Sequence, residues 1–214
     1  MVAFVKKPTE AWHSRNLLEN GMGYVVVARF KGNGDAEVGV FLLDMHCLGV
    51  KSAFFTQLYA EEYEQDFLQR IYEHDGRTAL APPCARKLVE DAVAYARQLG
   101  FEPHPDYRKG ARVFGGIDPS TCTQQFTFGS KGKPLYIQGP DDSPAMVERV
   151  MGALTRRCGE GGFHYVLAMD GPRPEGEDWP ENADAADVTA SPEPDESPSD
   201  RSGRANPSSP TDGR

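Results

Sequence analysis

The feature that most limits how this chain can fold is the composition of its C-terminal segment, residues 171–214. The segment contains no Ile, Leu, Met, Phe or Tyr, and its only large apolar residues are Trp179 and Val188. Such a segment buries too little apolar surface to offset the entropy cost of ordering. We therefore expect residues 171–214 to form a disordered, acidic, Pro/Ser-rich tail, and residues 1–170 to form a single folded domain.

The charge is divided in the same way. The 214-residue chain has a formal net charge of −9, and the tail, with eleven Asp or Glu and four Arg, carries −7 of it, which leaves −2 for residues 1–170. Broad binding to DNA or to anionic membranes requires an excess of Lys and Arg. We therefore expect no membrane partner. The charge does not favour nucleic acid either, although a local basic patch on a nearly neutral domain is compatible with it.

Cysteine usage suggests a reducing compartment. The four cysteines, at positions 47, 84, 122 and 158, are far apart in the sequence, and none forms a CxxC pair. The N-terminal residues contain no apolar run typical of a signal peptide, and no stretch is apolar enough over a sufficient length to span a bilayer. These features predict a soluble cytoplasmic protein with four reduced thiols and no disulfide.

Hydrophobic periodicity and turn residues predict an α+β fold. Strands are expected over Tyr24–Lys31 and Glu37–Leu48, which form an antiparallel hairpin around the turn at 32–35. The second of these strands is apolar on both faces, so it should lie inside the sheet. Helices are expected over Thr9–Asn20, Ser52–His74 and Pro82–Leu99.

The second half of the domain shows the same order of elements. Strands are expected over Thr123–Gly129 and Pro134–Gly139, then a helix from Ser143 to Cys158, then a strand over Phe163–Met169. Each half, about 1–100 and 101–170, is thus a hairpin followed by a helix. The predicted fold is a mixed, largely antiparallel sheet built from two hairpin-plus-helix halves, with helices packed on it.

Asp44 and His46 are the most unusual residues of the first hairpin. On a strand they point to the same face, among apolar neighbours, where a carboxylate and an imidazole need partners. One interpretation is a catalytic or metal-binding pair near the end of an inner strand. The alternative is structural: Asp44 caps or salt-bridges a nearby element, and His46 bonds to a backbone carbonyl.

Two lysine-containing segments are candidates for contacts with anions. Lys51 and Ser52 lie where the second strand should pass into a helix, and free N–H groups at a helix start bind phosphate. The P-loop spacing is absent, and Ser52 as an ordinary cap beside a solvated Lys51 is the alternative. Lys131 and Lys133, at the second hairpin turn, are candidates for nucleic-acid contact, or simply exposed lysines at a loop tip.

Two functions from different classes follow from these residues. The first is a non-catalytic domain that binds an unknown protein or small-molecule partner. The second is a metal-dependent hydrolase, phosphoesterase or nuclease-like, in which Asp44 and His46 hold a divalent metal and Asp106 or Asp118 completes the site. The first is favoured because no motif places a further acidic ligand. A zinc site is disfavoured because only His46 and Cys47 are neighbours among the Cys and His residues, and adjacent strand residues face opposite ways. The sequence assigns no cofactor.

The composition of the tail generates a first prediction. A chain truncated after Gly171 should keep its melting temperature within a few degrees, because the removed residues bring almost no apolar surface to a core. Differential scanning calorimetry of the full and truncated chains measures this. Slow amide exchange between Asp184 and Pro210 in the intact protein would show that the tail is ordered.

Overall fold

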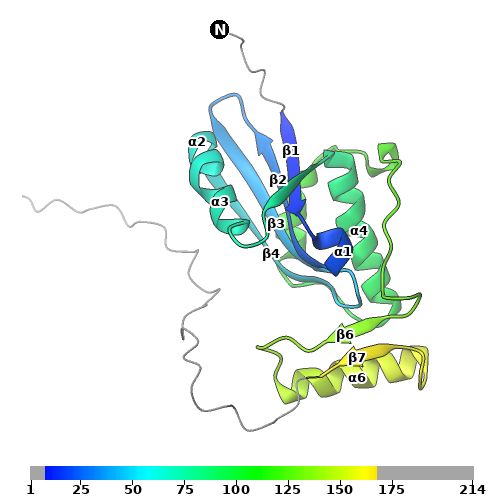
Figure 1. Cartoon of the computed structure of the whole chain (residues 1–214). Helices are drawn as coiled ribbons and strands as arrows, with labels where there is room; N and C mark the ends of the chain where they lie inside the picture. The colour runs from blue at the N-terminus through cyan, green and yellow to red at the C-terminus, as the bar shows by residue number, and fades with distance from the viewer. Residues whose placement is uncertain (1–7, 168–214) are drawn as a thin grey trace, which may run out of the picture. The chain divides into compact units, whose positions relative to one another are not determined.

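The computed structural model describes residues 8–167, and the chain has an α+β fold, as the sequence predicts. The tail predicted over 171–214 lies outside the described residues. The main sheet is antiparallel, with five strands in the order β4–β3–β2–β1–β5 (Figure 1). Its strands are β1 (Thr9–Ser14), β2 (Met22–Phe30), β3 (Asp35–Asp44), β4 (Gly49–Tyr59) and β5 (Arg77–Leu80).

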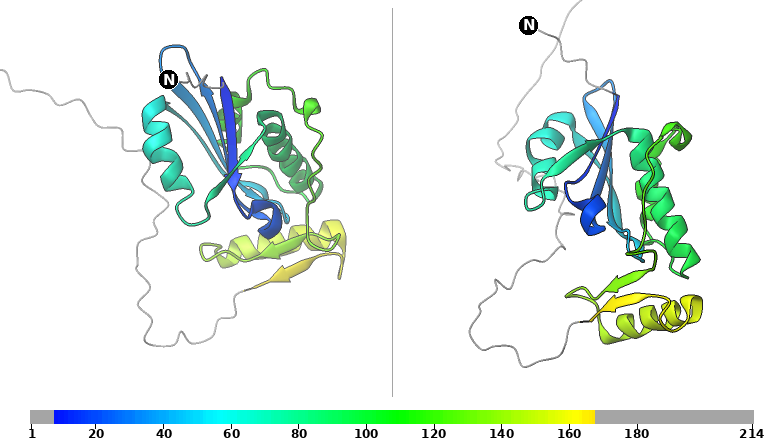
Figure 2. Two further views of the ribbon diagram at one scale, coloured as in Figure 1. Left: turned by 45° about the horizontal axis from the view of Figure 1, so that its top comes forward. Right: turned by 45° about the vertical axis from the view of Figure 1, so that its right-hand side comes forward.

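Helices cover both faces of this sheet (Figure 2). One face carries α4 (Pro82–Gln98), and the short α5 (Tyr107–Gly110) with its 3₁₀ extension η2 (Ala111–Phe114) contacts the same core. The other face carries one continuous helical segment made of α2 (Ala60–Glu62), the π-helical turn η1 (Tyr63–Phe67) and α3 (Leu68–Ile71).

Successive residues of the inner strands alternate between these two cores. Val25 and Val27 of β2 pack with α4, whereas Val26 and Ala28 pack with the segment that contains Tyr63. Strand β3 is divided in the same way and lies between β2 and β4. The prediction that this strand is an inner strand covered on both sides is confirmed, as is the hairpin that it forms with β2.

Two of the predicted helices in the first half are largely wrong. Residues 9–14 form β1, which is paired on both sides with β2 and β5, and only α1 (Leu17–Asn20) is helical. Residues 49–59 form β4, an eleven-residue edge strand, and the helix expected from Ser52 begins at Ala60. In both cases hydrogen bonds to a partner strand, which local spacing cannot reveal, outweigh helical propensity.

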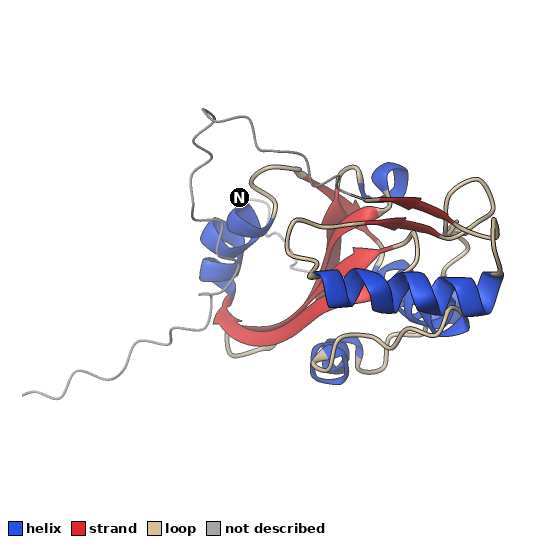
Figure 3. Ribbon diagram, turned by 90° about the horizontal axis from the view of Figure 1, so that it is seen from below, coloured by secondary structure: helices blue, strands red, loops and turns tan. Residues whose placement is uncertain are grey.

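The second half is not a hairpin followed by a helix. Strand β6 (Leu135–Ile137) pairs in parallel with β7 (His164–Val166), and α6 (Pro144–Cys158) connects them and lies along them (Figure 3). Residues 123–128 form no strand. Instead, Phe126 and Phe128 pack against the α4 core. The predicted turn at 130–133 is present, and Ser143 caps α6 through a hydrogen bond from the Met146 amide to its Oγ.

The β6–α6–β7 unit packs on the end of the main sheet through a third apolar cluster. Tyr136, Val150 and Leu154 are buried there against Cys47, Leu48 and Leu99. Two backbone bonds join the same regions: Gly129 N donates to Met45 O at 2.9 Å, and Leu135 N to His46 O at 3.2 Å.

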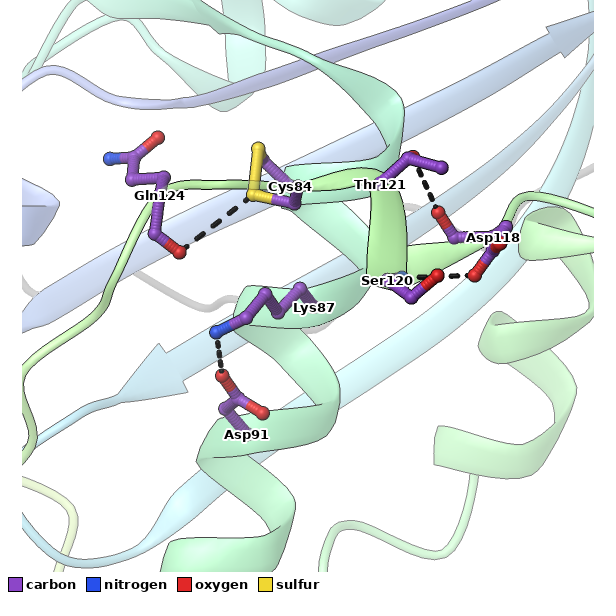
Figure 4. The surroundings of a disulfide bond; sticks show 8 residues. Cys84, Lys87, Asp91, Asp118, Ser120, Thr121 and Gln124 are labelled. Carbon is purple, nitrogen blue, oxygen red and sulfur yellow. Dashed lines mark hydrogen bonds and ion pairs between the residues drawn. A yellow bond between two sulfur atoms is a disulfide. The ribbon is translucent and has the colours of Figure 1, made fainter.

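The prediction of four free thiols is wrong. Cys84, in the first turn of α4, forms a disulfide with Cys122, which follows the 3₁₀ turn η3 (Pro119–Thr121) (Figure 4). Cys47 and Cys158 are free. The bond forms because the segment after α5 folds back along α4, where Arg86 Nη1 donates to Ile117 O at 2.7 Å. A sequence separation of 38 residues gave no indication of this proximity.

None of the helices within residues 8–167 combines the length and the apolar character needed to cross a membrane.

The disulfide generates a prediction about stability. Closing a loop of this size restricts the unfolded chain and contributes about 4 kcal/mol in the chain-entropy treatment. Dithiothreitol should therefore lower the melting temperature of the wild type but not that of a Cys84→Ser/Cys122→Ser variant. Thiol titration of the denatured protein without reductant should count two thiols. A count of four in protein purified without reductant would contradict the bond.

Candidate functional site

Asp44 is a buried structural carboxylate at the end of β3. The residue is 2% exposed, and its Oδ1 accepts hydrogen bonds from His46 N at 2.8 Å and from Cys47 N at 3.0 Å. Burial raises the pKa of Asp44, against the lowering effects of these two donors and of the nearby Lys51. The carboxylate therefore fixes the turn that follows β3, which is the capping role considered as the alternative from the sequence.

His46 does not share a strand face with Asp44, because β3 ends at Asp44 and His46 lies in the turn. Its Nε2 is 2.8 Å from Asn20 O, as in the structural alternative predicted from the sequence. The ring lies against Gly21, where an added Cβ would be 2.3 Å from it. Gly21 also has φ 73°, which favours glycine.

The residues considered as completions of a metal site are engaged elsewhere. Asp118 accepts a hydrogen bond from Ser120 N at 2.9 Å, and Asp106 lies 4.0 Å from Nδ1 of His104. Among residues 8–167, no three His, Cys, Asp or Glu side chains are grouped so that they could hold a metal ion.

Lys51 lies at an irregularity of β4 and not at a helix start, so the reason given for an anion site at Lys51 and Ser52 is wrong. Ser52 pairs with Leu42 and Val50 pairs with Leu43, so Lys51 is an extra residue, a β-bulge. In a regular strand, consecutive side chains point to opposite faces, but Val50 and Lys51 both line one pocket. Ser52 does not line it.

This pocket has a volume of about 520 Å³, which is in the range of small-molecule sites. Its walls come from the start of β4, the loop 100–105 and α6. The apolar lining residues are Leu48, Val50, Phe101, Pro103, Pro105, Met146 and Ala153. The polar lining residues are Lys51, Glu102, His104, Arg149 and Arg156.

The loop wall is held by backbone bonds and prolines. His104 N donates to Val50 O at 2.9 Å, which ties the loop to β4, and Pro103 and Pro105 restrict the backbone on either side. Nδ1 of His104 accepts a hydrogen bond from Asp106 N at 3.2 Å. A neutral ring in this arrangement carries its proton on Nε2, which is then available as a donor.

The helix wall is one stripe of α6. Met146, Arg149, Ala153 and Arg156 follow three- and four-residue spacing, so they share one side of the helix. Arg149 and Arg156 were not selected from the sequence. The sequence does contain a signal for this pair. Two arginines seven residues apart lie on one face of a helix, and the bounds of this helix are predicted correctly. Only the fold shows that this face lines the same pocket as Lys51.

The charge of the pocket is positive. Within the described range 8–167, no carboxylate lies at ion-pair distance from Lys51, Arg149 or Arg156. The acidic lining residue, Glu102, forms an ion pair with Arg97, at 3.1 Å from its Nε. Arg97 does not line the pocket. Three positive charges therefore gather at a concave, partly apolar surface of a nearly neutral domain.

The lysines of the turn at 130–133 are separate from this pocket, and neither of them lines it. Lys131 is exposed and has φ 51°. Lys133 Nζ donates to Gly161 O at 2.7 Å, which links the turn to the loop before β7. Their contact with nucleic acid stays a prediction.

Comparison with protein-family models, curated proteins and solved structures found no match.

The geometry of Asp44 generates a prediction. Asp44→Ala leaves two amide donors without an acceptor and should lower the free energy of unfolding by about 1–3 kcal/mol. Asp44→Asn keeps an acceptor oxygen without the charge. Burial raises the pKa of Asp44 in the folded state above its value in the unfolded chain. The contribution of Asp44 to the free energy of unfolding is therefore fully present below the unfolded-state pKa, and it is lost as the pH rises through the folded-state pKa.

Urea unfolding of the wild type and of Asp44→Asn between about pH 4 and pH 8 tests this sign. The stability of Asn relative to Asp should increase as the pH rises. The opposite trend would mean that the backbone donors and Lys51 outweigh burial and lower the pKa of Asp44.

Proposed function

We propose that this domain is a non-catalytic binding domain whose pocket between β4, the loop 100–105 and α6 takes a small anionic ligand. The observation that supports the proposal is the convergence of Lys51, Arg149 and Arg156 on one concave surface, with no carboxylate among residues 8–167 at ion-pair distance from them. Arginine and lysine donate charge-assisted hydrogen bonds to carboxylates and phosphates, and these bonds are stronger than neutral ones.

The local contacts favour binding over the hydrolase alternative. A metal-dependent hydrolase using Asp44 and His46 would need both side chains to face a ligand. Asp44 is buried with Oδ1 bonded to two amides, and Nε2 of His46 is directed at a backbone carbonyl. In the binding proposal, both residues support the turn beside the pocket and need not touch the ligand. We assign no cofactor.

The disulfide bears on the cellular compartment in which the protein works. The wide spacing of the cysteines led to the prediction of a reducing cytoplasm. The Cys84–Cys122 bond favours an oxidising compartment, because cytosolic reductants keep protein thiols reduced. A small anionic ligand is compatible with either location, so the binding proposal does not depend on it.

Anion binding can be tested with inorganic phosphate, pyrophosphate and citrate as probes in isothermal titration calorimetry at low ionic strength. Lys51→Met, Arg149→Met and Arg156→Met each remove one charge and keep a long side chain. Each change that removes a hydrogen bond to the bound anion should weaken binding about tenfold or more, because a charge-assisted hydrogen bond contributes about 1.5–3 kcal/mol. Added salt should weaken binding to the wild type.

The matched control is Arg157→Met. Arg157 is exposed on α6 next to Arg156 but does not line the pocket, so its loss should change affinity little. If Arg156→Met and Arg157→Met reduce the affinity for the anion equally, binding depends only on the overall positive charge of α6 and not on the pocket. No heat and no thermal shift with these three anions or with longer dicarboxylates would reject the proposed function.

A further inference from the structure

The two arginines of α6 place their charged groups far apart along the pocket. Arg149 Nη2 donates to Met146 Sδ at 2.8 Å, so its guanidinium lies back beside residue 146. Arg156 is also directed toward the helix N-terminus, because a Cβ at Gly152 would lie 3.3 Å from its Nη1. Positions 146 and 152 are roughly 9 Å apart along the helix axis, at about 1.5 Å per residue.

A single carboxylate or phosphate is too small to accept hydrogen bonds from both groups in these positions. Charge-assisted N–H···O bonds are about 2.7–2.9 Å long, so each guanidinium needs an anionic group of its own close by. A compact polyanion such as pyrophosphate holds its charges too near one another to match this spacing.

Apolar residues make up much of the pocket surface that the two arginines share. Ala153 lies between them on the stripe of α6 that lines the pocket, and Leu48, Val50 and Phe101 line the walls contributed by the main sheet and the loop. A polar centre in the ligand over Ala153 would lose hydrogen bonds to water without replacing them. Lys51 adds a third positive charge from the β4 wall.

We propose that the ligand is an elongated dianion with an apolar spacer, of which a medium-chain α,ω-dicarboxylate is the simplest representative. One anionic end binds at Arg149, the other at Arg156, and the spacer packs over Ala153. This inference rests on the proposed function, since it specifies the ligand class of the same pocket.

A series of dicarboxylates tests the spacing. Succinate, adipate, suberate and sebacate carry their carboxylates progressively farther apart, and calorimetry should show affinity rising to suberate or sebacate. Octanoate has the chain length of suberate with a single carboxylate, and it should bind at least tenfold more weakly. This comparison separates the second charge from the general gain of a longer apolar chain.

The variants assign the two ends. In Arg149→Met and in Arg156→Met, suberate and octanoate should bind with nearly equal affinity. In Arg157→Met, suberate should still bind more tightly than octanoate. If phosphate or succinate binds through Lys51, Arg149 and Arg156 as tightly as suberate, the two-ended ligand is rejected and the anion pocket stands. If no anion in either series binds, both are rejected.

Discussion

The pair of hydrogen bonds from the His46 and Cys47 amides to Asp44 is the interaction on which the arrangement around the pocket depends. It closes the turn after β3. That turn supplies the carbonyls of Met45 and His46 to the segment that contains Gly129 and Leu135, and it supplies Cys47 and Leu48 to the third apolar cluster. One buried carboxylate thus positions both the polar and the apolar contacts between the main sheet and the β6–α6–β7 unit.

The pocket follows from this docking and from one irregularity in β4. The bulge directs Lys51 and Val50 to the same side, and α6, docked through Val150 and Leu154, brings Arg149 and Arg156 to face them. A regular strand at this position would turn one of the two β4 side chains away. The site therefore depends on the bulge in β4 and on the docking of α6 together, and not on any single sequence motif.

The sequence was informative wherever structure is determined locally. The β2–β3 hairpin, α4 and the Ser143 cap of α6 were predicted because turn residues, caps and helical spacing are encoded within a few positions. Strands β1 and β4 were misread as helices because their conformation depends on partner strands. The apolar residues around Phe54 fit helical spacing nearly as well as they fit a strand, so periodicity alone could not decide.

The same limit applies to the candidate site. Asp44 was identified correctly as a polar group that needs partners, and its capping role is local enough to have been among the alternatives. Lys51 was selected for a helix start that does not exist. Arg149, Arg156 and the Cys84–Cys122 bond depend on contacts across long sequence separations. A single sequence offers no covariation from which such contacts could be inferred.

The pocket walls have a consequence for folding kinetics. They come from residues 48–51, 100–105 and 146–156, so the cavity exists only after chain segments separated by about half the domain have met. Contacts between residues so far apart in the sequence form slowly, because closing the intervening loops costs chain entropy before these contacts stabilise the fold. The meander of β2, β3 and β4 can form without them. Because the pocket forms late in folding, a bound ligand would stabilise the native state more than the transition state. It would therefore slow unfolding more than it speeds folding.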